Sequence, residues 1–282
     1  MWLGLTLTVD AQSVLEEVNQ RLAADLVRVG DHHGAAIEYR RLSLHAEDAD
    51  AGDGYRWLSA YHYLKQGSPD VALNVLDAAE QRSGQERWET DLLRAWAAEQ
   101  VQHLGEEVFY LESVLDHEGL SGEEADYASR KLAAALIRDR QTDRARDVMT
   151  SSPRVDQTTV DALGRYVNGK DKSPFLGGCL GVIPGAGYAY AGEYANAFRS
   201  LILNSLFIYG MAQSADDEEW GAFSIITFFE MTWYTGSIYG GVDSSIRYNL
   251  KREQTLLDKV SAGVTMTADE SMIPAVVLNF RF

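Results

Sequence analysis

The N-terminal half of the chain places apolar residues at the i, i+3 and i+4 spacing of amphipathic helices, with turn signals between them. Small residues recur in this pattern every 36 or 37 residues, in two series: Ala23, Ala60, Ala97 and Ala134, then Ala35, Ala72, Val108 and Ala145. Small residues let helix backbones approach closely, and helix pairs that cannot bury their apolar faces alone must stack. The pattern predicts a mainly α fold with a four-unit helical repeat over residues 12–168.

Residues 30–39 resemble the turn and second helix of a tetratricopeptide repeat, with Gly30 at the turn, Ala35 at the packing point and Tyr39 four residues later. Residues 67–76 and 141–149 repeat this pattern more loosely. The resemblance implies an α-solenoid whose groove receives an extended peptide or a partner helix. The period of 37 exceeds the roughly 34 residues of that family, and an irregular helical bundle is the alternative.

The composition changes abruptly after a linker at residues 169–174. Two apolar runs, residues 197–215 and 221–242, match the roughly 20 residues that cross a bilayer, and a charged turn at residues 216–219 separates them. We therefore predict a Gly-rich membrane-embedded helical module over residues 169–250 that contains a membrane helical hairpin. The alternative is a pair of buried core helices.

Small residues spaced four apart accompany these runs. This spacing lets membrane helices touch backbone to backbone, so we predict a helix-packing role for six glycines: Gly177, Gly181, Gly185, Gly187, Gly236 and Gly240. A phosphate-cradling loop is the alternative, but the segment has no Gly-Lys-Ser/Thr ending.

Glu230 and Asn204 are the candidate polar residues within the apolar runs. A carboxylate in such a run costs several kcal/mol unless it is paired, neutral or facing water. Candidate partners for Glu230 are Asn204, Arg199, Tyr188, Tyr190 and Tyr234. Glu230 is interpreted either as part of a proton or ion relay or as a protonated residue that pairs helices.

The C-terminal part also resembles a known group of proteins. Its motifs are Ser173-Pro174, Pro184-Gly185-Ala186-Gly187-Tyr188, Tyr190-Ala191-Gly192, Asn204, Phe228-Phe229-Glu230, Trp233-Tyr234 and Ile238-Tyr239-Gly240. The chain resembles bacterial tetratricopeptide-repeat membrane proteins of uncharacterised function, and its module is similar to the two-pass membrane domain family. The resemblance implies a signal peptide, a cell-envelope location and no enzymatic activity.

The two ends of the chain give further expectations. Residues 1–11 contain a short apolar run and a Val9-Asp10-Ala11 cleavage-like site, which indicates a signal-peptide remnant, although a basic first segment is lacking. Basic residues after the last run, Arg247, Lys251 and Arg252, favour the cytoplasmic side. Three spans would place the repeat domain outside the cytoplasm, and two spans would place it inside. In the tail, residues 251–282, the alternation of Val276, Leu278, Phe280 and Phe282 predicts a β-hairpin that could act as a docking strand.

Charge and motif content narrow the functional classes. The net charge is −17, with −13 in residues 1–169 (17 basic, 30 acidic) and −4 in residues 170–282 (8 basic, 12 acidic). An acidic surface disfavours nucleic-acid binding. The single cysteine, Cys179, excludes an intrachain disulfide, and no zinc or nucleophile-elbow motif is present. We expect no catalytic residue, cofactor or metal.

These observations favour a membrane-anchored scaffold of the bacterial cell envelope. Its helical repeat would bind protein partners, residues 174–242 would contact the lipid bilayer, and the chain could form a homo-oligomer. The alternative is a small membrane transporter or channel component that uses Glu230.

Overall fold

The computed structural model describes residues 11–46, 48–83, 87–152, 154–262, 264–268 and 274–278. The chain divides into two compact units: unit 1 comprises Met1–Asp161 and Val260–Phe282, and unit 2 comprises Ala162–Lys259. The predicted signal-peptide remnant lies outside the described residues except for Ala11, the first residue of α1. Each unit has its own packing.

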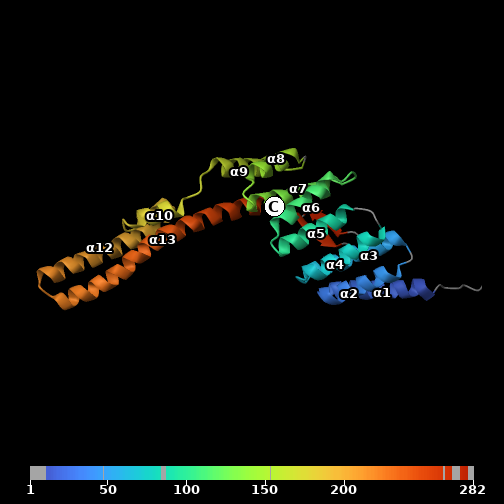
Figure 1. Cartoon of the computed structure of the whole chain (residues 1–282), viewed down its shortest axis with the longest axis horizontal. Coiled ribbons are helices and arrows are strands. Elements are labelled where there is room, and N and C mark those ends of the chain that lie inside the picture. The colour runs from blue at the N-terminus through green and yellow to red at the C-terminus, as the bar shows by residue number, and fades with distance from the viewer. Residues whose placement is uncertain are drawn as a thin grey trace, which may run out of the picture. The chain divides into compact units, whose positions relative to one another are not determined.

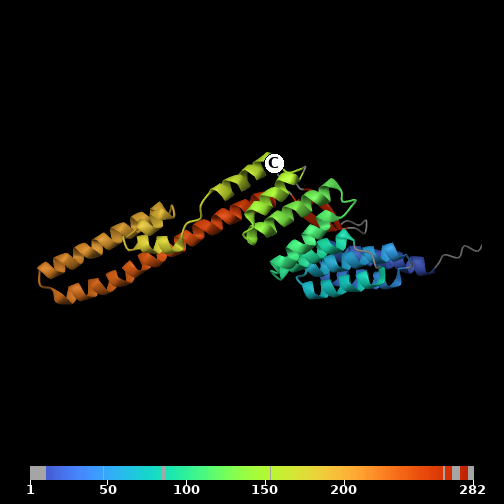
Figure 2. The same ribbon diagram turned by 45° about the horizontal axis from the view of Figure 1, so that its top comes forward.

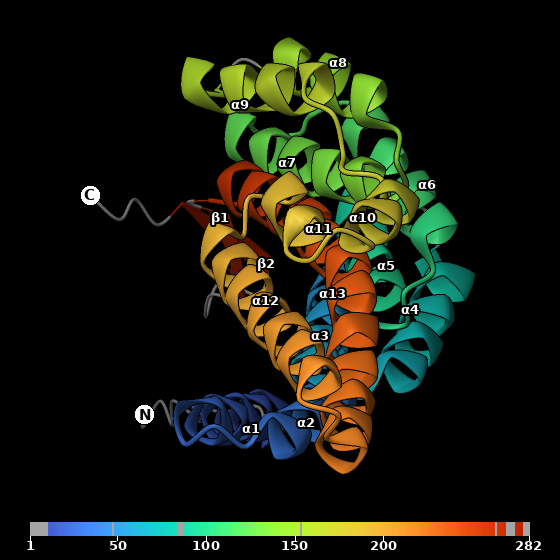
Figure 3. The same ribbon diagram turned by 90° about the vertical axis from the view of Figure 1, so that its left-hand side faces the viewer.

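Unit 1 is a stack of antiparallel helix pairs in which each helix lies against the next in sequence (Figures 1 and 3). The helices are α1 (Ala11–Arg28), α2 (His32–His45), α3 (Ala49–Lys65), α4 (Pro69–Ser83), α5 (Trp88–Gln100), α6 (Leu104–Asp116), α7 (Gly122–Arg138) and α8 (Thr142–Ser151). This arrangement is consistent with the predicted helical repeat.

The turn within each helix pair has the same backbone form. Gly30, Gly67, Gln102 and Arg140 all have a positive φ, of 81°, 79°, 60° and 62°. Glycine adopts this conformation at little cost, which explains two of the four turns. After Gly30 the next helix begins with a cap in which the Asp31 side chain accepts a hydrogen bond from the Gly34 backbone N–H, at 2.9 Å.

The recurring small residues pack where the helices meet. Every member of the first series is buried on α1, α3, α5 or α7. Ala35, Ala72 and Ala145 are buried in the second helix of their pairs. In the third pair, however, the residue at the same distance from the turn is Glu107. Its N–H donates to the carbonyl of His103, the residue after the turn, just as the N–H of Ala35 donates to the carbonyl of Asp31. Val108 follows one position later.

Unit 1 also contains two short strands, β1 (Val264–Ala268) and β2 (Pro274–Leu278). They pair antiparallel, with Val264 opposite Leu278 and Ala268 opposite Pro274. β2 lies against α3 and α7. Phe280 and Phe282, which belong to the predicted alternation, lie outside the described residues.

Unit 2 is built on two long helices, α12 (Tyr194–Asp216) and α13 (Trp220–Val260), which lie side by side (Figures 1 and 2). Two short helices, α10 (Pro174–Gly181) and α11 (Ala186–Tyr190), precede them, and α9 (Gln157–Asn168) begins in unit 1 and ends in unit 2. The rings of Phe207 on α12 and Trp233 on α13 are in contact, with their centroids 6.5 Å apart. The hairpin turns at residues 216–219.

The predicted membrane helical hairpin, and with it that part of the predicted fold class, is wrong. Within the described ranges, no helix combines the length and the apolarity that crossing a bilayer requires. The two runs are helical, but polar residues recur in them, such as Ser200, Asn204 and Gln213 on α12 and Thr227 and Glu230 on α13. Run length alone therefore overestimated their apolarity. They are not buried core helices either, because their large apolar side chains are exposed.

Candidate functional site

Two of the four first helices of the repeat pairs, α3 and α7, are covered on all sides over most of their length. Each residue of α3 from Gly52 to Leu64 is buried, and so is each residue of α7 from Asp126 to Ile137 except Lys131. Thirteen consecutive buried residues go round a helix more than three times, so no face of α3 is open. Along α4 and α6, by contrast, buried residues alternate with exposed ones, which is typical of helices with one solvated face.

β2 supplies the additional cover, because it lies against both α3 and α7. We call the side of these two helices that β2 contacts the inner face. In the described part of unit 1, the inner face is therefore occupied by an extended segment of the same chain.

Buried ion pairs lie on the two helices of the inner face. Asp53 pairs with Arg56 on α3, and Asp126 pairs with Arg130 on α7 at 2.9 Å. All four side chains are at most 10 % exposed. Asp53 and Asp126 stand at the same place in their helices, fourteen residues before the turn residues Gly67 and Arg140. A repeated buried pair of this kind holds its arginine in one orientation.

Arg130 shows what such an arginine can do. Its Nε donates to Asp126, and its Nη1 donates to the backbone carbonyl of Val260 at 3.2 Å. Val260 is fully buried at the end of α13, where the chain turns toward β1. The guanidinium thus binds a main-chain acceptor at the start of the covering segment, a contact that requires no particular side chain in that segment.

The sequence-derived polar residues lie elsewhere, in the seam between α12 and α13. Asn204 is fully buried; its Nδ2 donates to the Ser200 carbonyl at 2.6 Å, and its Oδ1 has no partner among the described residues. Glu230 is 7 % exposed, and its Oε2 likewise has no partner there. Burial raises the pKa of Glu230, because a low-dielectric setting disfavours the charged carboxylate.

The candidate partners of Glu230 bind other groups. Tyr234 donates to the Val182 carbonyl at 2.8 Å, Tyr190 accepts from the Ser173 N–H, and Arg199 donates to Asn196. Among the described residues no hydrogen-bonded chain leads away from Glu230. The relay interpretation gains no support from this geometry.

The six glycines with a predicted packing role differ in how much space a Cβ atom would have. A Cβ at Gly177 would overlap the carbonyl of Gly241, one at Gly181 would come within 2.7 Å of the Ile238 Cα, and one at Gly187 within 2.6 Å of the Gly177 carbonyl. Gly185, at φ 83°, would overlap the Ala197 carbonyl, and Gly240 the Tyr188 ring.

Gly236 differs from these glycines, because a Cβ there would meet nothing within 4 Å. Gly241 was missed by the sequence reasoning, although it faces Gly177 and Gly187. The reason is that Gly240 and Gly241 are adjacent, and spacing alone cannot tell which of the two points at α10.

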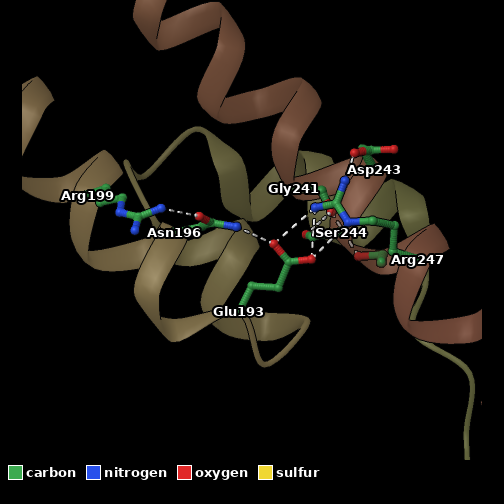
Figure 4. Close-up of polar contacts among 8 residues, drawn as sticks. Glu193, Asn196, Arg199, Gly241, Asp243, Ser244 and Arg247 are labelled. Carbon is green, nitrogen blue, oxygen red and sulfur yellow. Dashed lines mark hydrogen bonds and ion pairs between the residues drawn. The ribbon is translucent and has the colours of Figure 1, made fainter. Parts of the chain in front are cut away.

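A polar network fastens the start of α12 to α13 (Figure 4). Glu193 accepts hydrogen bonds from Asn196 at 2.6 Å and from Arg247 Nε and Nη2 at 3.0 and 2.8 Å. Burial raises the pKa of Glu193, but these bonds outweigh it and hold the pKa below its ordinary value. Arg247 also pairs with Asp243.

In comparisons with known proteins, no family model, no curated protein and no solved structure matches the chain. The two family resemblances therefore stay predictions. Within the described residues, no group of three or more His, Cys, Asp or Glu side chains could hold a metal ion.

Proposed function

We propose that this chain is a protein-binding scaffold whose helical repeat receives an extended polypeptide segment on the inner face of α3 and α7. One observation carries the proposal: β2 lies against both helices while their residues are buried on every side. The inner face is already filled by a segment of the kind that it would receive.

The chemistry of the inner face suits a backbone ligand. An extended segment exposes carbonyl and N–H groups that must find partners when water is excluded. Arg130, fixed by Asp126, supplies such a partner to the carbonyl of Val260, the last residue of α13, directly before the segment that continues into β1 and β2. Asp53 and Arg56 form a second buried ion pair on α3, the other helix that β2 contacts. Main-chain recognition tolerates a range of sequences, which is useful in a scaffold.

No helix of the described residues has the length and apolarity to cross a bilayer, so the proposal is made without the membrane module. The transporter alternative is not carried further because no observation favours it. A protein partner would bind by replacing the resident C-terminal segment. Binding in this form is an exchange of one segment for another.

The test uses the full chain with a protease site inserted between Asp258 and Lys259, two exposed residues near the end of α13, so that the released fragment contains Val260. After cleavage we expect the C-terminal fragment to remain bound to the repeat during gel filtration and to exchange with a labelled synthetic peptide of residues 259–282. If the fragment separates at once and the labelled peptide does not bind, the inner face is not a receptor and the proposal fails.

Two variants sharpen this test. Arg130→Met removes the donor to the Val260 carbonyl and should increase the rate at which the cleaved fragment dissociates. Arg154→Met removes an exposed ion pair between Arg154 and Glu123, in which the side chains are 46 % and 52 % exposed, respectively. It should leave the dissociation rate unchanged. Equal effects of the two substitutions would contradict a specific role for Arg130.

A further inference from the structure

Unit 2 contains a groove between α9 and the last third of α13. Its volume is about 340 Å³, and every residue that lines it belongs to unit 2. We call it the basic groove, because four of its lining residues are cations and none is Asp or Glu. The cations and the two tyrosines beside them are Arg165, Tyr166, Tyr248, Lys251, Arg252 and Lys259. A cavity of this volume is within the range that small ligands occupy.

The cations lie on both walls of the basic groove. Lys251, Thr255 and Lys259 are four residues apart on α13, so they occupy successive turns of one face, about 6 Å apart along the helix axis. Arg165 lines the groove from α9. Four of the eight Lys and Arg residues of unit 2 are gathered here, in a chain whose net charge is −17.

Most of this positive charge is not neutralised. Arg252 pairs with Asp171 at 2.6 Å, but the side chains of Arg165, Lys251 and Lys259 form no ion pair or hydrogen bond with any described residue. Like charges in one groove repel each other. An anion that enters the groove relieves this repulsion, and the groove thereby favours its binding.

The groove is held in shape without a ligand. Arg252 Nη2 donates to the Tyr166 carbonyl at 2.7 Å, which joins α13 to α9. Asn249 exchanges two hydrogen bonds of 2.8 Å with the backbone of Lys172, which ties the linker to α13. The Arg252 guanidinium lies 4.6 Å from the Tyr166 ring centroid, and Lys172 Nζ lies 5.5 Å from that of Tyr248. Ring contacts hold a cation in place without cancelling its charge.

A ligand for the basic groove must carry several negative charges in a small volume. A terminal phosphate carries close to two charges at neutral pH, whereas a carboxylate carries one. Phosphate oxygens also match the planar fork of an arginine such as Arg165, and lysines bind phosphate as point charges. Lys251 and Lys259 are separated by about 12 Å along α13, which favours more than one phosphate group in the ligand.

We infer that the basic groove binds a compact ligand with two or more phosphate groups, and that Arg165, Lys251 and Lys259 contact the phosphate oxygens. Such a site goes beyond the proposed scaffold function. It lies in unit 2 and would operate whether or not the inner face of unit 1 receives a polypeptide segment.

Calorimetric titration of the full chain with sodium tripolyphosphate, at neutral pH and constant ionic strength, tests the site. We expect saturable binding of one anion per chain, and we expect Arg165→Gln to weaken the affinity by about tenfold or more. Arg199→Gln is the matched control, because Arg199 is an exposed arginine of α12 outside the groove. It removes the same charge and should leave the affinity unchanged.

A second variant makes the test independent of Arg165. Replacing Lys251 and Lys259 together by Gln should also weaken binding by about tenfold or more, while the melting temperature of the ligand-free chain stays the same, because neither lysine has a described partner to lose. Absence of saturable binding at millimolar tripolyphosphate overturns the inference. So does an equal loss in Arg165→Gln and Arg199→Gln, or tighter binding of a hexaglutamate peptide than of tripolyphosphate.

A parallel measurement identifies the source of the phosphate groups. Phosphatidylcholine vesicles that contain phosphatidylinositol bisphosphate present the same chemistry on a lipid headgroup. Vesicle binding that tripolyphosphate abolishes would support the site with a headgroup as its ligand. Tripolyphosphate binding without vesicle binding would support the site with a soluble ligand.

Discussion

At the scale of single residues, His62 in α3 is held neutral by its surroundings. It is 2 % exposed and stacks on the rings of Tyr39 and His32, at centroid distances of 5.5 and 5.2 Å. Burial, followed by the charges of His32 and Lys65, lowers the pKa of His62 to about 4. The unfolded chain takes up this proton near pH 6.5, so the folded state resists a protonation that the unfolded state accepts.

The depressed pKa predicts acid sensitivity. The contribution of His62 to stability is complete above pH 6.5 and is lost as the pH falls from 6.5 toward 4, by about 3 kcal/mol in all. In urea titrations, His62→Gln should lower stability at pH 7 but should lose less on acidification to pH 4.5 than the unmodified chain. His103→Gln, at an exposed histidine, should follow the unmodified chain. Parallel pH curves for His62→Gln and the unmodified chain would contradict this assignment.

Glu107 is the second residue with a consequence for stability, because it occupies the place that alanine holds in the other three repeat pairs. It is 1 % exposed and pairs with Arg138 at 2.5 Å. Burial raises the pKa of the Glu107 carboxyl, and Arg138 opposes this effect. A buried carboxylate that loses its only close partner is strongly destabilising.

We therefore expect Arg138→Gln to lower the free energy of unfolding by about 2–3 kcal/mol at pH 7. The loss should shrink as the pH falls, because the raised pKa lets Glu107 become neutral at a higher pH than an exposed glutamate does. Adding Glu107→Ala should restore part of the stability, since alanine suits this place elsewhere in the stack. Arg144→Gln, which breaks an exposed pair with Glu112, should cost less than about 1 kcal/mol. A pH-independent loss in Arg138→Gln would refute the explanation.

Sequence reasoning located the packing alanines of the stack, but not Glu107. The 37-residue spacing found the buried alanines because small residues are the visible mark of close helix packing. In the third pair the turn residue Gln102 follows Gly67 by 35 residues, which shifts the register, and a glutamate does not look like a packing residue. Only the position of Arg138 in the fold explains why a carboxylate is accommodated there.

At the scale of elements, the glycines of unit 2 determine how closely α10 approaches α13. Gly177→Ala would drive a Cβ into the backbone carbonyl of Gly241, which cannot rotate away. We expect unfolding to become easier by about 1–3 kcal/mol. Gly236→Ala is the matched control from the same predicted set: it has open space in a helix interior and should stabilise by about 0.5–1 kcal/mol. Thermal denaturation of both variants distinguishes the two sites, and equal shifts would contradict the close approach.

The four-residue spacing of small residues thus indicated a packing device but could not show which glycine faces a backbone. That depends on the rotation of α13 about its own axis, and contacts with α10 and α11 set this rotation. The same limit applies to β2. Its alternation was visible in the sequence, but its place against α3 and α7 depends on contacts between residues far apart in the chain.

At the scale of the whole molecule, the largest error in the sequence-based account was the membrane module. The length of the two apolar runs suggested spans, but the recurring polar residues of α12 and α13 leave no described helix apolar enough to cross a bilayer. The unusual feature of these helices is the side on which their apolar residues lie, and that side is visible only once the hairpin is formed.

The central claim is that the inner face of unit 1 receives an extended segment and is occupied by the C-terminal one. Its most direct test measures the affinity of the labelled peptide of residues 259–282 for two forms of the chain. One form is intact, and the other has been cleaved between Asp258 and Lys259 and freed of the released fragment. A tethered segment competes at high effective concentration, so we predict that cleavage and removal strengthen peptide binding at least tenfold. Equal affinity for the two forms, or no binding to either, would contradict the account.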